Sequence, residues 1–327
     1  MKRWPLVFLF LFLVACATPP ETPTPTVAPA SSEIIEFESL TFPGHLWTPF
    51  MPPPEEGTAT AVTGQLKIPA STGRVPAVIL THGCGSITNG ELTWADKLYE
   101  FGVATLLVHS FGARHIPEVC TGEYQVNIAS MLADVYAARD LLAIHPRIDS
   151  ERIAIMGLSF GGRTALWAGM KRFQEQYGLD TSQFAAYLAF YPASCYLYLE
   201  GETDVSGGPI RIFHGAADDW IPIGPCKEYV GRLQAAGVDA ALLEYPDAHH
   251  SFDDLQSPLE TIPDVLSPGN CAFVEQDGRI VDPETGLEAG IAAACVTRGG
   301  TIGYNAAAAA QAVIDVEEFL TKVFQLE

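Results

Sequence analysis

The stretch "IAIMGLSFGGRTALW", residues 153–167, passes from an apolar run to a serine between glycines and then to a segment with helical spacing. Within it, Gly157, Ser159 and Gly161 form the pattern G-x-S-x-G. A sharp turn from a strand into a helix leaves no room for Cβ atoms beside the serine, which favours glycine on both sides. A plain turn of small residues has the same composition. A nucleophilic serine also needs a base and an acid elsewhere in the chain, because its hydroxyl alone is weakly reactive.

Candidates for both partners follow downstream, each after an apolar run. "HGAADDWIP" (214–222) contains Asp218, and "YPDAHHSF" (245–252) contains His250. The order Ser, Asp, His along the chain is that of the α/β-hydrolase fold and differs from the two other common triad orders. We therefore expect Ser159, Asp218 and His250 to form a catalytic triad.

Each partner has a neighbour of the same type. Asp218 is favoured over Asp219 by its spacing from the flanking glycine and proline. His250 is favoured over His249 by the phenylalanine two residues further on. Both alternatives remain open at this level.

The segment "THGCGS" (81–86) follows another apolar run and supplies a candidate oxyanion hole. The backbone N–H groups of Cys84 and Phe160 would together receive the negative oxygen of a reaction intermediate. His82 and His214, each at the end of an apolar run, are expected to be structural.

Trp94 and Trp220 are candidates to line a substrate pocket, and a place in the core or on the surface is the alternative for both. The chain has no C-x-x-C motif. We therefore expect no metal site. The proposed triad chemistry requires no cofactor.

The organisation of the chain predicts an α/β fold. Strands buried on both faces are typically continuous in hydrophobicity, as the apolar runs here are. Strands alternating with helices predict a mostly parallel, doubly wound sheet with helices on both faces. Residues 253–304 break this rhythm and are expected to form an excursion packed on the domain. The expected strands lie at 75–83, 102–110, 152–159, 184–192, 209–215 and 239–246, and the helices at 127–146, 226–237 and 305–324.

From about residue 60 to 252 the chain resembles the dienelactone hydrolase branch of the α/β-hydrolase superfamily. The resemblance implies an eight-stranded or similar sheet, hydrolysis of esters or lactones, and no metal. Enzymes that open dienelactone usually carry cysteine at the nucleophile position, where this chain has Ser159. The departure favours a more general carboxylesterase. The matching segments are "HGCGS" (82–86), "HSFGAR" (109–114), "GLSFGG" (157–162), "GAADDWIP" (215–222) and "AHHSF" (248–252).

The N-terminus reads as an export signal. Two basic residues precede an apolar run at 6–14 that is too short to span a bilayer. The following "LVAC" (13–16) resembles the lipobox of bacterial lipoproteins, which implies cleavage after residues 1–15 and lipid attachment to Cys16. An ordinary secretory signal is the alternative.

Residues 16–32 are rich in Pro and Thr, which predicts an extended linker before a hydrolase domain at 33–327. The expected location is the periplasmic or extracellular face of a bacterial membrane, reached through the lipid anchor.

Six cysteines remain once Cys16 is set aside, and an even number in an exported chain indicates disulfides. Six cysteines allow 15 pairings. Joining neighbours in sequence closes the shortest loops, and six free thiols are the alternative. The expected pairs are Cys84–Cys120, Cys195–Cys226 and Cys271–Cys295.

Composition limits the partners of the chain. Its 327 residues are 48% hydrophobic and 17% charged, as in globular proteins. The net charge of −21 argues against nucleic acid as a partner, because phosphate binding needs a basic surface. The expected partner is a small-molecule or polymeric ester. Two alternatives stay open: a serine peptidase related to prolyl oligopeptidases, and a non-catalytic lipoprotein that uses the fold to bind a ligand.

Overall fold

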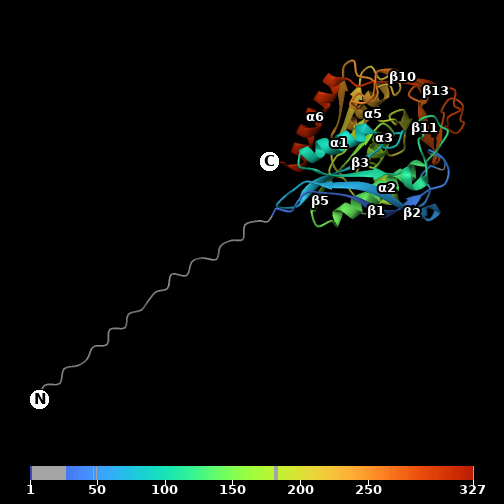
Figure 1. Cartoon of the computed structure of the whole chain (residues 1–327). Helices are drawn as coiled ribbons and strands as arrows, with labels where there is room; N and C mark the ends of the chain where they lie inside the picture. The colour runs from blue at the N-terminus through green and yellow to red at the C-terminus, as the bar shows by residue number, and fades with distance from the viewer. Residues whose placement is uncertain (2–26, 47, 49, 180–182, 327) are drawn as a thin grey trace.

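The centre of the molecule is an eight-stranded sheet in the order β1-β2-β4-β3-β5-β6-β8-β9. Figure 1 labels β1, β2, β3 and β5 of this sheet. The computed structural model describes Met1 and residues 27–46, 48, 50–179 and 183–326. Six strands run parallel, while β1 and β2 pair antiparallel with each other and β2 with β4. The strands are β1 (Ser31–Thr41), β2 (Thr58–Ile68), β3 (Val75–Thr81), β4 (Ala104–His109), β5 (Ile148–Leu158), β6 (Tyr187–Phe190), β8 (Ile210–Gly215) and β9 (Ala240–Tyr245).

The expected α/β-hydrolase architecture is confirmed, and each of the six apolar runs coincides with one of the parallel strands, although β5 begins before its run, at Ile148. The central strand β3 is buried at every residue, which explains its continuous hydrophobicity. The sequence analysis missed β1 and β2. Both alternate between exposed and covered residues, because they form the antiparallel edge of the sheet and face solvent on one side.

Helices cover both faces of the sheet. Helices α1 and α6 pack on one face of the sheet, in a core cluster that includes Trp94, Leu98 and Leu320. Helices α2, α3 and α5 pack on the other face, in a cluster that includes Leu132 and Leu166. The three expected helices correspond to α2, α5 and α6. The helices are α1 (Asn89–Glu100), α2 (Ile128–Ala143), α3 (Phe160–Trp167), α4 (Lys171–Tyr177), α5 (Gly224–Ala235) and α6 (Ala306–Phe324), with 3₁₀ turns at η1 (Pro54–Glu56) and η2 (Gly112–Arg114).

The excursion at 253–304 folds into two small sheets rather than an irregular loop. Strand β10 pairs antiparallel with β13, and β11 pairs with β12 and with β7 of the main domain. An ion pair between Arg172 of α4 and Glu275 of β11 (2.6 Å) ties the excursion to the domain. The strands are β7 (Leu197–Tyr198), β10 (Glu260–Ser267), β11 (Phe273–Gln276), β12 (Arg279–Val281) and β13 (Thr297–Ile302).

The expected signal at 1–15 and Cys16 fall outside the described residues, apart from Met1. The end of the expected linker, by contrast, joins the fold. Ala28 forms a bridge with Ser71, and β1 begins at Ser31. None of the described helices is long and apolar enough to cross a membrane.

Candidate active site

Ser159 lies at the sharp turn between β5 and α3, with a positive φ that non-glycine residues rarely adopt (φ 53°, ψ −109°). The flanking glycines are required by contact distances. A Cβ on Gly157 would lie 2.1 Å from the Gly161 carbonyl oxygen, and one on Gly161 would lie 2.2 Å from the Thr81 carbonyl oxygen. Such backbone contacts cannot be relieved by a side-chain shift. The turn thus needs glycine at both positions and holds the serine at the carboxyl edge of the sheet.

The structure brings Ser159, His250 and Asp218 into one hydrogen-bonded chain. His250 Nε2 lies 2.9 Å from Ser159 Oγ, and His250 Nδ1 lies 2.7 Å from Asp218 Oδ2. Asp218 Oδ1 accepts hydrogen bonds from the backbone N–H groups of Trp220 (3.0 Å) and Ile221 (2.9 Å). The aspartate and the imidazole are buried, 5% and 1% exposed, so water competes little for these bonds.

Asp219 and His249, the neighbours of the same residue type, are not part of this hydrogen-bonded chain. Asp219 turns away from the imidazole and accepts hydrogen bonds from the backbone N–H and the hydroxyl of Thr301, both 2.8 Å long. It thereby ties the aspartate loop to β13. The hydrogen bonds to Ser159 and Asp218 belong to His250 and not to His249.

His82 and His214 lie where the sequence analysis expected structural residues. Each is fully buried, with Nδ1 within 3.1 Å of the carbonyl oxygen of the next residue. Burial lowers the pKa of both imidazoles. They are therefore neutral groups of the sheet edge at neutral pH.

The candidate oxyanion donors lie beside the serine. Residues 83–86 form a turn closed by a hydrogen bond from the Ser86 N–H to the Gly83 carbonyl (3.3 Å). Cys84 follows Gly83 in this turn and lines the same cavity as Ser159 and Phe160. Phe160 is the first residue of α3, where backbone N–H groups have no acceptor within the helix.

A mostly apolar cavity of about 240 Å³ opens beside Ser159. The excursion supplies part of its wall, through residues that include Leu266 and Val296. Trp220 lines the cavity and packs on His250, with ring centroids 4.7 Å apart. The pocket expectation thus agrees with the position of Trp220.

The pocket expectation for Trp94 is wrong. Trp94 is 2% exposed in the core between α1 and the sheet, and its indole N–H donates to Asp253 Oδ2 (2.6 Å). The Tyr191 hydroxyl donates to the other oxygen of the same carboxylate (2.6 Å). Burial raises the pKa of Asp253. Asp253 belongs to the excursion, and its hydrogen bond to the indole holds Trp94 in the core.

Sequence reasoning also missed Tyr191 and Arg163. The Tyr191 ring packs on His250 with centroids 4.4 Å apart, and its place near the carboxyl end of the strand expected at 184–192 was the available signal. Arg163, one turn into α3, lines the cavity and donates to the Ala193 carbonyl (2.7 Å) and the Tyr196 hydroxyl (3.0 Å). A buried arginine has no hydropathy signal that would reveal it.

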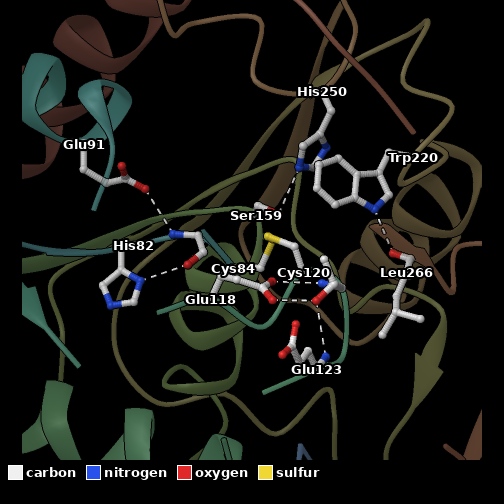
Figure 2. Close-up of a disulfide and its surroundings, with 12 residues drawn as sticks. His82, Cys84, Glu91, Glu118, Cys120, Glu123, Ser159, Trp220, His250 and Leu266 are labelled. Atoms are coloured by element: carbon white, nitrogen blue, oxygen red, sulfur yellow. Dashed lines mark hydrogen bonds between the residues drawn. A yellow bond between two sulfur atoms is a disulfide. The ribbon is translucent and has the colours of Figure 1, made fainter. Parts of the chain in front are cut away.

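Three disulfides join the pairs that the sequence analysis expected: Cys84–Cys120, Cys195–Cys226 and Cys271–Cys295. The first of them lies directly at the cavity, which both of its cysteines line. Figure 2 shows this disulfide with Ser159, His250 and Trp220 around it. Disulfides of this kind indicate a protein of an oxidising compartment, periplasmic or extracellular. Within the described part of the chain, no group of three or more His, Cys, Asp or Glu side chains is arranged to hold a metal ion.

The fold and this site define a serine-type α/β-hydrolase arrangement. Over residues 62–324 the chain matches the model of the dienelactone hydrolase family, and it belongs to that family. Because a lactone is a cyclic carboxylic ester, this membership makes the chain a carboxylic ester hydrolase.

Individual relatives are distant. The chain is 26% identical over 201 residues to a Bradyrhizobium protein named "Probable 2-oxo-3-(5-oxofuran-2-ylidene)propanoate lactonase", covering 57% of this chain and 77% of the relative. A dienelactone hydrolase-like promiscuous phosphotriesterase from metagenomic libraries shares the fold with a TM-score of 0.57 at 17% identity, over 91% of this chain and 100% of that one. Esterase 2 of Thermogutta terrifontis, phosphorylated by paraoxon, has a TM-score of 0.53 at 17% identity, over 81% and 90% of the two chains.

Proposed function

We propose that the chain hydrolyses carboxylic esters through an acyl-enzyme on Ser159. The observation that carries the proposal is the hydrogen-bonded chain from the Ser159 hydroxyl through His250 to buried Asp218. A serine, an imidazole and a carboxylate in this sequence are the parts that nucleophilic catalysis of acyl transfer requires.

In the proposed mechanism, His250 Nε2 accepts the proton of the Ser159 hydroxyl as the serine oxygen attacks the ester carbonyl carbon. Asp218 holds the Nδ1–H and stabilises the imidazolium that forms. The N–H groups of Cys84 and Phe160 donate to the oxyanion of the tetrahedral intermediate. His250 then protonates the leaving alcohol, and a water molecule that it deprotonates releases the acid.

The cavity favours uncharged, apolar substrate groups. Its lining is mostly apolar, and the guanidinium of Arg163 is engaged by Ala193 and Tyr196 at its edge. The net charge of −21 also repels anionic substrates. We therefore expect p-nitrophenyl butyrate to be a better substrate than the anionic p-nitrophenyl hemisuccinate, by roughly 10-fold or more in kcat/KM, since burying an unpaired carboxylate is costly.

The test of the proposed activity uses p-nitrophenyl butyrate with the wild-type chain and Ser159→Ala. Hydrolysis by the wild type that falls to background in the variant supports the proposal. Faster cleavage of aminoacyl p-nitroanilides than of esters would favour the peptidase instead. A folded wild-type protein without either activity would favour the non-catalytic binding lipoprotein.

We further propose that the chain is exported and held at a membrane by a lipid on Cys16. The "LVAC" pattern (13–16) and the three disulfides support this proposal. Expressed in a bacterium, the wild type should collect in the membrane fraction, and Cys16→Ala should not. Equal partition of both proteins into the soluble fraction would contradict the anchor.

A further inference from the structure

The turn at 83–86, which carries one candidate oxyanion donor, is held from two sides (Figure 2). On one side lies the carboxylate of Glu91, and on the other lies the disulfide from Cys84 to Cys120. The turn is also close to the nucleophile, because a Cβ on Gly83 would lie 3.7 Å from Ser159 Cβ.

Glu91 binds one N–H of the turn and so removes it from the possible oxyanion donors. Its side chain is 2% exposed, and Oε1 accepts the Gly83 N–H at 3.0 Å. Its Oε2 accepts the backbone N–H and the hydroxyl of Thr88, which closes the capping box of α1. With the Gly83 N–H bound to Glu91 and the Ser86 N–H bound to Gly83, the Cys84 N–H is among the N–H groups of the turn that can be offered to an oxyanion.

The disulfide fixes Cys84 from the opposite side. The Cys84 sulfur is bonded to Cys120, and the Cys84 carbonyl accepts a hydrogen bond from the Val119 N–H (2.8 Å). The segment that carries Cys120 is itself braced, because the Glu118 carboxylate accepts the N–H (2.9 Å) and the hydroxyl of Thr121. Cys84 is therefore attached to an ordered segment through both a covalent bond and a backbone hydrogen bond.

Hydrogen bonds connect the segment that carries Cys120 to the excursion, and the excursion to a residue beside the triad. The Cys120 carbonyl accepts the N–H of Leu266 at 2.8 Å, and the Leu266 carbonyl accepts the indole N–H of Trp220 at 2.8 Å. The Trp220 ring packs on the imidazole of His250, as Figure 2 shows. One connected path thus joins the oxyanion turn, the cavity wall and the catalytic histidine.

We propose that the Cys84–Cys120 disulfide and the Glu91 carboxylate are positioning groups for the oxyanion hole. Neither touches the reacting atoms; each acts by holding the Cys84 N–H at a fixed place relative to Ser159. The proposal rests on the proposed esterase function. An oxyanion hole works because its donors are oriented before the charge develops, so loosening the turn costs rate in the chemical step more than it costs substrate binding.

The disulfide is tested with Cys84→Ala/Cys120→Ala in the otherwise complete chain. Cys195→Ala/Cys226→Ala is the matched control, because the two disulfides span 36 and 31 residues and so stabilise the fold to a similar degree. Working well below the melting temperature of each protein, we expect the first variant to lose ~10-fold or more in kcat on p-nitrophenyl butyrate, with KM within about threefold. The control should keep kcat within about threefold.

A second measurement separates a displaced oxyanion donor from a general loss of rigidity in the fold. A trifluoromethyl ketone adds to the serine and places a negative oxygen in the oxyanion hole. Its affinity should fall in the Cys84/Cys120 variant in proportion to kcat/KM, while the shape of the pH dependence of kcat/KM should stay the same.

Glu91 is tested independently of the disulfide. Glu91→Gln has one acceptor oxygen where the carboxylate offers two, so it can accept the Gly83 N–H only by leaving the Thr88 N–H facing an NH₂ group; its kcat should therefore lie between those of the wild type and Glu91→Leu. Glu91→Leu removes the acceptor and should lower kcat by ~10-fold or more. Thr88→Ala, which disrupts the helix cap but leaves the Gly83 contact, is the control and should retain activity.

The outcomes separate the two proposals. Wild-type esterase activity that survives removal of the Cys84–Cys120 disulfide and the Glu91→Leu change would overturn the positioning role and leave the proposed function intact. A kcat loss of equal size in the Cys195/Cys226 control would also overturn it, because the effect would then be one of fold stability. Absence of esterase activity in the wild type would instead remove the proposed function.

Discussion

Replacing Asp218 by Asn removes the carboxylate charge beside His250 without changing the shape of the site. The carboxylate Oδ1 accepts the N–H groups of Trp220 and Ile221, and Oδ2 faces His250 Nδ1 at 2.7 Å. In Asp218→Asn, the amide oxygen must stay at the Oδ1 position, because an NH₂ group there would face two backbone donors. The NH₂ group then occupies the Oδ2 position and donates to Nδ1.

This arrangement forces the imidazole into the wrong tautomer. With Nδ1 acting as an acceptor, the ring proton moves to Nε2, which faces the Ser159 hydroxyl and can no longer remove its proton. Loss of the correct tautomer in a Ser-His-Asp triad lowers kcat by about 10⁴-fold, which corresponds to about 5.4 kcal/mol of transition-state stabilisation.

The assay is hydrolysis of p-nitrophenyl butyrate at neutral pH, with the melting temperature measured in parallel. Asp218→Asn should lose about 10⁴-fold in kcat while it stays folded, and Asp219→Asn, whose carboxylate binds Thr301, should lose less than about threefold. A loss below about 10-fold in Asp218→Asn, or an equal loss in Asp219→Asn, would refute the reasoning.

Four further outcomes follow from contacts and burial. Gly157→Ala should destabilise the fold by roughly 3 kcal/mol or more, since its Cβ would lie 2.1 Å from a carbonyl oxygen. Thermal melting measures this loss of stability, and an unchanged melting temperature would contradict the prediction. Trp94→Phe leaves a buried carboxylate without one hydrogen-bond donor and should cost about 1–3 kcal/mol of stability, with little change in kcat. A large loss of kcat in a stable protein would instead indicate that Trp94 lines the substrate pocket. Trp220→Ala, which uncovers the catalytic imidazole, should lower kcat/KM by roughly 10-fold in the same esterase assay, and full activity would show that the ring is dispensable. Burial lowers the pKa of His82 and His214, so the stability that they contribute is complete above about pH 6.5 and is lost as the pH falls toward their native pKa values. Unfolding measured from pH 7.5 to 5 should therefore show falling stability, and replacing His214 by Gln should flatten the slope.

The parts of the fold that could be predicted from the sequence are those that depend on residues close together in the chain. Gly157 and Gly161 stand beside the serine because a Cβ at either position would lie within 2.2 Å of a backbone carbonyl oxygen, and that requirement is visible as a five-residue pattern. The parallel strands are buried on both faces, so their hydrophobicity is continuous. Strands β1 and β2 were missed because a half-exposed edge strand alternates and contains many polar residues.

Other features depend on contacts between distant residues. Nothing near Trp94 distinguishes a pocket tryptophan from a core one; its place follows from a hydrogen bond to Asp253, 159 residues away in sequence. The same carboxylate orients Tyr191, whose ring packs on His250. The excursion interrupts the alternation of strands and helices visibly, but its contribution to the cavity wall becomes apparent only when the chain is folded.

The most direct test of the central claim is chemical labelling of the serine. A fluorophosphonate probe is added to the folded wild-type chain, to Ser159→Ala and to His250→Ala, and the labelled peptide is identified by mass spectrometry. A serine activated by the imidazole 2.9 Å away should carry the label at Ser159 in the wild type, none in Ser159→Ala, and at a rate lower by at least about 10³-fold in His250→Ala. Labelling elsewhere in the chain, or none in a folded wild-type protein, would contradict the account.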